Sequence, residues 1–234
     1  HRLGIDNLAK YAKKLGFGSN TGIGLSGEKS GLIPTSAWKK KVKNEVWYPG
    51  ETISASIGQG YNLITPLQNV SMISAISNGG FLPTPYLVKK IEDSEGKLIK
   101  EFPPPNLKKI AMDPEILKHL KEGLRGVVYE PHGTGHRARL KNIVVSGKTG
   151  TAQVVSMKDS EDIDPDEKIP YSFRDHAWFI AFAPYENPDI AVSIIIEHGG
   201  HGGETAAPIA RKIIKNYFTH YPPTKVSEKD LSIN

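Results

Sequence analysis

The stretch Ile143-Val144-Val145-Ser146-Gly147-Lys148-Thr149-Gly150-Thr151-Ala152-Gln153-Val154-Val155 places β-branched residues on both sides of a small, polar centre with one cation. β-Branched residues favour strands, and a glycine inside a strand often marks the close approach of another backbone or of a ligand. Lys148 offers a positive charge and three donors, and Thr149 and Thr151 offer hydroxyl groups. The pattern therefore predicts a strand over residues 143–155 that binds a carboxylate or an oxyanion.

The composition is that of an ordinary globular protein. The chain has 234 residues, of which 38% are hydrophobic and 24% charged, and a formal net charge of +5. This length fits one large domain or two small ones. No basic stripe interleaved with aromatic residues indicates nucleic-acid binding. The absence of cysteine excludes disulfides, thiolate catalysis and cysteine-ligated zinc, and no apolar run reaches the roughly 18 residues that a membrane span needs.

Two further apolar runs follow the opening stretch, at residues 177–182 and 190–196. The short connection between them favours antiparallel pairing, because parallel strands need a long crossover. Strands are also expected at residues 86–88 and 98–99, and a short strand or extended stretch at residues 52–57. Helices are expected over residues 5–15, from Thr65-Pro66 to Gly79, from Asp113-Pro114 onward and over residues 204–218. This order predicts an α+β fold in which helices flank an antiparallel sheet.

The segment Gly147-Lys148-Thr149 also resembles the end of a phosphate-binding P-loop. That motif requires a glycine at position 142, where this chain has Asn142, and a helix after the threonine. Residues 151–155 favour a strand instead. Nucleotide binding is therefore disfavoured.

Lys148-Thr149-Gly150-Thr151 is instead one of the three motifs of serine acyltransferases that act on penicillin and on D-Ala-D-Ala peptides. Other segments resemble class B penicillin-binding proteins, namely residues 16–18 with 21–23, 56–61 with 65–68, and 176–184. Glu197-His198-Gly199-Gly200-His201-Gly202 is similar to the elongation type, penicillin-binding protein 2. The resemblance covers nearly all of residues 1–218 and points to the C-terminal part of the transpeptidase domain.

The resemblance implies roles for four residues of the opening stretch. Lys148 would hold the substrate carboxylate and support proton shuttling, and the Thr151 N–H would be an oxyanion-hole donor, so these two are the expected catalytic residues. Thr149 would bind the carboxylate through its hydroxyl, and Gly150 would keep the strand face open to the substrate. The alternative for Lys148 is an ordinary solvent-facing lysine.

The resemblance also implies a penicillin-binding transpeptidase (β-lactamase-like) fold over residues 1–221, followed by a polar tail at residues 222–234. The expected activity is D,D-transpeptidation, in which a serine is acylated by a peptidoglycan stem peptide and the acyl group passes to an amine. The expected partners are stem peptides, β-lactams and membrane proteins of the elongation complex, with no metal or organic cofactor. The expected location is the periplasmic face of the inner membrane, with an anchor upstream of this chain.

The family also needs a Ser-x-x-Lys nucleophile and a Ser-x-Asn or Ser-x-Asp motif before the Lys-Thr-Gly strand. Literal matches at Ser26–Lys29, Ser36–Lys39 and Ser232–Asn234 stand in the wrong local context or order, so we interpret them as coincidences. Both motifs are expected upstream of His1, and the chain alone is predicted to be inactive. A β-lactam sensor, a non-catalytic scaffold and a serine β-lactamase are the alternative functions.

His198, His201 and Glu204 offer a possible set of metal ligands. The glycines among them predict a tight turn bordering the substrate groove instead, since a fixed metal scaffold needs a stiffer backbone.

Overall fold

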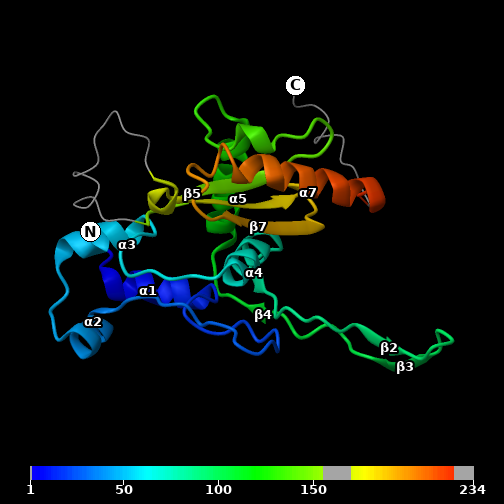
Figure 1. The fold of residues 1–234 in the computed structure, drawn as a ribbon, viewed down its shortest axis with the longest axis horizontal. Coiled ribbons are helices and arrows are strands. Elements are labelled where there is room, and N and C mark those ends of the chain that lie inside the picture. The colour runs from blue at the N-terminus through cyan, green and yellow to red at the C-terminus, as the bar shows by residue number, and fades with distance from the viewer. Residues whose placement is uncertain (1, 155–169, 224–234) are drawn as a thin grey trace. The chain divides into compact units, whose positions relative to one another are not determined.

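The computed structural model describes residues 2–154 and 170–223 (Figure 1). The chain divides into two compact units. The first contains His1–Ala75 and Gly80–Ala111, and the second contains Ile76–Gly79 and Met112–Asn234.

The second unit is built on a three-stranded antiparallel sheet in the order β5-β6-β7. The strands are β5 (Ser146–Ala152), β6 (His176–Ala183) and β7 (Ile190–Ile196). The other elements in the described part of this unit are helices α5 (Pro114–Tyr129) and α7 (Ala206–His220) and the short 3-10 helices η1 (His136–Ala138) and η2 (Tyr171–Phe173). The predicted antiparallel sheet with flanking helices is confirmed.

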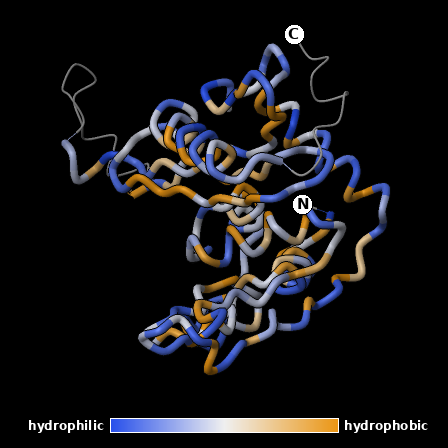
Figure 2. Tube along the Cα trace, turned by 90° about the vertical axis from the view of Figure 1, so that its right-hand side faces the viewer, coloured by the Kyte–Doolittle hydropathy of each residue, from blue (hydrophilic) through white to orange (hydrophobic). Residues whose placement is uncertain are grey.

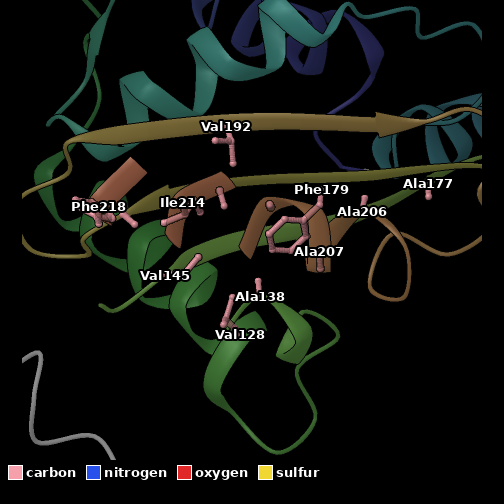
Figure 3. Close-up of a cluster of buried hydrophobic side chains, with 13 residues drawn as sticks. Val128, Ala138, Val145, Ala177, Phe179, Val192, Ala206, Ala207, Ile214 and Phe218 are labelled. Atoms are coloured by element: carbon pink, nitrogen blue, oxygen red, sulfur yellow. The ribbon is translucent and has the colours of Figure 1, made fainter. Parts of the chain in front are cut away.

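The core of this unit lies where the central strand meets the helices (Figure 3). Alternate residues of β6 (Ala177, Phe179 and Ala181) are fully buried, as the period of two in a strand requires. They pack against Val128 of α5 and Ile214 of α7, among others. Tight packing of small alanines here leaves little room between sheet and helices, so the position of α7 over the sheet is closely fixed.

The first unit contains four helices and two short strand pairs. The helices are α1 (Ile5–Lys14), α2 (Ser36–Lys43), α3 (Pro49–Ser56) and α4 (Pro66–Ser77). The strands pair as β1 (Phe81–Leu82) with β4 (Lys108–Lys109), and β2 (Lys90–Glu92) with β3 (Leu98–Glu101). Figure 2 shows hydrophilic and hydrophobic stretches alternating along the chain.

The start of α4 confirms the predicted cap. The Gln68 N–H donates to the Thr65 hydroxyl at 3.2 Å, and the Thr65 N–H donates to the Gln68 side-chain oxygen at 3.0 Å. These two reciprocal bonds form a capping box. The Gln68 amide also donates to the carbonyl oxygens of Ser19 and Ser30, each at 2.8 Å, so this buried side chain ties the glycine-rich loop to the helix.

The short strand or extended stretch expected at residues 52–57 is wrong, because residues 52–56 belong to helix α3 and Ile57 is its C-cap. Pro49 occupies the start of the helix, and the Glu51 carboxylate accepts a hydrogen bond from the Tyr48 N–H at 2.8 Å. These local signals favour a helix start and outweigh the strand preference of Thr52, Ile53 and Ile57.

The predicted hairpin forms around the Asp93–Gly96 turn, but its first strand is β2 at Lys90–Glu92 and not residues 86–88. The boundary at residue 221 between domain and polar tail stays a prediction, since residues 224–234 lie outside those described. None of the helices in the described part of the chain is both long and apolar enough to cross a membrane.

Candidate active site

Strand β5 lies at one edge of the sheet in the described structure, with β6 as its neighbour. Thr149 is paired with Phe179 and Thr151 with Ala177, both fully buried residues of β6. An edge strand leaves backbone donors and acceptors on one side for another chain or a ligand. The sequence-predicted motif therefore lies where a substrate can reach its backbone.

Side chains along β5 alternate between the two faces of the sheet. Thr149 and Thr151 share one face, whereas Lys148, paired with Ile180, points to the other. The Lys148 side chain is exposed, and its Nζ donates to the Thr149 carbonyl oxygen at 2.8 Å. The long side chain thus folds back along the strand, and its charge stays near the backbone of the motif.

A groove of about 430 Å³ runs beside the two threonines. It is lined by Thr134, His136, Arg137, Thr149, Thr151, His201, Gly202, Gly203 and Glu204. The structure therefore brings Thr149 and Thr151 together in one groove, and Lys148 is not among its lining residues. The His201 turn borders this groove, as the sequence predicted.

The loop before α7 packs directly on β5. A Cβ atom at Gly202 would lie 2.1 Å from the Trp178 carbonyl oxygen and 2.6 Å from that of Gly150. Contacts this short are impossible for a real side chain, so only glycine lets the loop reach the strand. Gly202 and Gly150 thus meet backbone to backbone, which sets the width of the groove at this point.

The segment before β5 forms the other wall of the groove. The Thr134 hydroxyl lies 2.7 Å from the Thr149 hydroxyl, and an Arg137 guanidinium N–H donates to the Glu204 carbonyl oxygen at 3.2 Å. A Cβ at Gly133 would meet the Val127 carbonyl oxygen at 2.3 Å, so this wall packs tightly on the last turn of α5. Two loops that are 67 residues apart in sequence are thereby joined across the groove.

The Tyr129 side chain contacts the backbone of the segment that leads into β5. Its hydroxyl lies 3.4 Å from the Ile143 carbonyl oxygen and accepts from the Val145 N–H at 3.4 Å. Burial raises the pKa of Tyr129, so the phenol keeps its proton and remains a donor at neutral pH.

The groove is lined by several donors that can bind a carboxylate. Its walls carry the Thr134, Thr149 and Thr151 hydroxyls and the Arg137 guanidinium, although the Glu204 carboxylate also belongs to the lining. Hydroxyl and guanidinium groups are the usual partners of a carboxylate.

His198 lies outside the groove lining. The backbone N–H of His198 donates to His176 Nδ1 at 2.9 Å. The ring Nδ1 of His198 lies 3.1 Å from the Arg174 carbonyl oxygen. Within residues 2–154 and 170–223, no three His, Cys, Asp or Glu side chains are grouped to hold a metal ion. His198 and His201 therefore have different surroundings.

The match Ser36–Lys39 lies in the first unit, at the start of α2. Lys39 Nζ is 2.6 Å from a Glu51 carboxylate oxygen and 3.2 Å from one of Glu45. Burial disfavours the charged form of Lys39, but the hydrogen bonds that Lys39 donates to the two carboxylates outweigh burial and raise its pKa. A lysine that stays protonated cannot take a proton from a serine, which agrees with a coincidental match. Ser232–Asn234 lies outside the described residues.

Sequence reasoning missed Thr134 and Arg137 as members of the site. Thr134 lies within the Gly133-Thr134-Gly135 segment, and Arg137 follows that segment on the way to the strand. A glycine on each side of a threonine is the signal that was available. Their place opposite Thr149 depends on packing against α5 and α7, which no local pattern records.

Residues 1–215 match the family model described as the penicillin binding protein transpeptidase domain. The chain belongs to this family. The peptidoglycan D,D-transpeptidase MrdA of Salmonella typhimurium is 37% identical over 221 residues, which cover 93% of this chain and 35% of the relative. This chain thus spans about a third of the length of the curated relatives that it matches.

Two solved structures share the fold. The penicillin-binding protein PBP2 of Helicobacter pylori, in a complex with MreC, has a TM-score of 0.77 and 33% identity, covering 94% of this chain and 37% of that one. The PBP2 of Pseudomonas aeruginosa in complex with WCK 5153 has a TM-score of 0.75 and 32% identity, covering 98% of this chain and 45% of that one. The predicted penicillin-binding transpeptidase fold is confirmed.

Proposed function

We propose that this chain supplies the Lys-Thr-Gly wall of a serine D,D-transpeptidase that cross-links peptidoglycan. The observation that carries the proposal is the groove in which Thr149 and Thr151 lie together on an edge strand. Membership of the transpeptidase family supports the same reaction.

The terminal carboxylate of a D-Ala-D-Ala stem peptide binds to the Thr149 and Thr151 hydroxyls, and the Lys148 ammonium adds its charge from the strand edge. Residues two apart direct their backbone groups to the same side of an antiparallel strand. The Thr151 N–H therefore lies on the same side of β5 as the Thr149 carbonyl that accepts Lys148 Nζ. An N–H at this edge stabilises the oxyanion of the tetrahedral intermediate, and one such donor contributes about 3–4 kcal/mol.

The attacking serine comes from a Ser-x-x-Lys segment that precedes this chain in the full-length protein. Its oxygen bonds to the carbonyl carbon of the penultimate D-Ala, the peptide bond to the last D-Ala breaks, and D-Ala leaves with the serine proton. An amine of a neighbouring stem peptide then attacks the ester, forms the cross-link and returns the proton to the serine.

The same acyl site reacts with β-lactams. By analogy with the relatives, the full-length protein works at the periplasmic face of the inner membrane and assembles with proteins of cell elongation. One relative of known structure was determined in a complex with MreC, and another in a peptidoglycan synthase complex.

Acylation by a fluorescent penicillin tests the proposal. The 234-residue chain alone is expected to stay unlabelled, whereas a longer protein that includes the upstream segment forms a stable adduct. Labelling of the chain alone would refute the assignment of the nucleophile. Rapid hydrolysis of the adduct would indicate a β-lactamase, and a stable adduct without cross-linking of stem peptides would indicate a β-lactam sensor.

A further inference from the structure

A second groove lies within the same unit, between the segment that precedes β5 and the last turns of α7. Its volume is about 420 Å³. It is lined by Leu140, Lys141, Asn142, Ile143, Arg211, Lys215, Phe218 and Thr219. None of these residues lines the groove beside Thr149, so the two sites are separate.

The floor of this second groove is apolar and its rim is cationic. Phe218 belongs to the buried core (Figure 3). The half-buried Leu140 and Ile143 pack against that core. Arg211, Lys215 and Thr219 follow one another at intervals of four along α7, which places them in one row on the helix surface.

The positive charge of the rim is unopposed. Arg211 and Lys215 form no ion pair with any described residue, and neither does Lys141 across the groove. Helix α7 contains no acidic residue between Ala206 and His220, and residues 139–143 contain none either. Cations gathered in this way repel one another, so an anionic ligand that neutralises them gains free energy.

We propose that this groove binds an acidic segment of a partner protein, in which carboxylates flank at least one bulky apolar side chain. The apolar side chain covers Leu140, Ile143 and Phe218, and the carboxylates pair with Lys141, Arg211 and Lys215. Arg211 can hold a carboxylate through two parallel hydrogen bonds. A peptide fits this combination better than a bilayer does, because a flat lipid surface cannot enter a concave groove. A free phosphate would leave the apolar floor uncovered.

The probe is a fluorescein-labelled peptide, Glu-Asp-Phe-Leu-Asp-Glu, titrated with the full chain in fluorescence anisotropy at low salt. Two comparison peptides separate the contributions: one carries Gln and Asn in place of the acids, and one carries Ser-Ser in place of Phe-Leu. Both are expected to bind at least about tenfold more weakly than the probe. Equal binding of all three peptides would overturn the proposal, as would no binding of the probe at about 1 mM protein.

The charge-reversed variant Lys215→Glu locates the site. We expect it to weaken probe binding at least about tenfold, whereas Lys212→Glu changes binding less than about threefold. Lys212 is the matched control because it is an exposed cation of the same helix that does not line the groove. An equal loss in both variants would mean that the probe senses only the general positive charge, and would overturn the proposal.

Two alternative ligands of this groove, a membrane and the chain's own C-terminal residues, would each give a different result. Phosphatidylglycerol vesicles that bind the chain while the probe does not would assign the surface to a membrane. Tighter probe binding by Glu228→Lys/Asp230→Lys would identify the chain's own C-terminal residues as the competing occupant. Either result would overturn the assignment to a partner protein.

Discussion

The Thr134 and Thr149 hydroxyl oxygens lie 2.7 Å apart, so one of them donates its proton to the other. Only one direction of this hydrogen bond leaves the Thr149 hydroxyl proton available to a carboxylate. If Thr134 donates to Thr149, the Thr149 proton is free to point into the groove. Thr134 is therefore a positioning residue for the hydroxyl that the motif presents.

Replacing Thr134 by valine keeps the shape of the side chain and removes its hydroxyl. We expect Thr134→Val to slow acylation by a fluorescent penicillin about fivefold to thirtyfold in the longer protein, since one lost hydrogen bond is worth about 1–2 kcal/mol. Thr134→Ser should restore most of the rate, because serine can donate the same bond. A valine variant with the wild-type rate, or a serine variant as slow as valine, would contradict this role.

The charge of Lys148 is expected to matter more than its bulk. Lys148→Ala in the longer protein should slow acylation by about 100-fold or more, because the cation beside the Thr149 carbonyl is lost from the edge of β5 that we propose to bind the substrate. Lys148→Arg should retain part of the rate. Lys97→Ala, which removes an exposed lysine of the first unit, is the matched control and should leave the rate unchanged. Equal rates for Lys148→Ala and the control would support the alternative of an ordinary solvent-facing lysine.

Elements with local signals were predictable from the sequence. Thr65 and Gln68 cap α4, and Asp113 accepts from the Glu115 N–H at 2.8 Å at the start of α5, because a cap involves neighbours two or three residues away. The short connection between β6 and β7 likewise fixed their antiparallel pairing. Helix α3 was missed because the strand preference of isoleucine and threonine was weighed above the Pro49 and Glu51 signals.

The site was predictable along β5 and not across the groove. Thr149 and Thr151 lie on one face because they are two residues apart, and the same rule places Lys148 on the other face. Thr134 reaches Thr149 only because Gly133 packs on α5, and Gly202 reaches Gly150 only because α7 lies over the sheet. Contacts of this kind depend on the packed structure, and no sequence period encodes them.

The same substitution should have opposite effects at two glycines. Gly202→Ala places a methyl group 2.1 Å from the Trp178 carbonyl oxygen, so the loop must move away from β5. We expect it to lower the free energy of unfolding by about 1–3 kcal/mol. Gly123 lies inside α5, and an added Cβ there would have no heavy atom within 4 Å. Gly123→Ala should therefore raise the free energy of unfolding by about 0.5–1 kcal/mol.

Urea unfolding of both variants of the 234-residue chain measures these changes. A Gly202→Ala variant as stable as the wild type would show that the loop does not need its backbone contact with Gly150. In the longer protein, Gly202→Ala should also slow penicillin acylation, whereas Gly123→Ala should not.

Glu28 makes the stability of the first unit depend on pH. Its carboxylate accepts the Thr21 hydroxyl and the Thr21 N–H, each at 2.6 Å. These bonds hold the pKa of Glu28 below its usual value, and burial opposes them less strongly. A carboxyl group whose pKa is lower in the folded state stabilises the fold above the unfolded pKa of about 4.3, and this contribution is lost as the pH falls through the folded pKa.

Glu28→Gln removes the charge and keeps the size of the side chain. The variant should be less stable than the wild type at pH 7, because a neutral amide oxygen is a weaker acceptor than a carboxylate. The difference should shrink as the pH falls below about 4.3 and through the lowered pKa of Glu28, since the wild type then loses its charge and the variant has none to lose. Urea unfolding across this range checks the expectation, with Glu95→Gln in the β2–β3 turn as the control. A difference between wild type and Glu28→Gln that stays constant with pH would show that the bonds to Thr21 do not depend on the charge of Glu28.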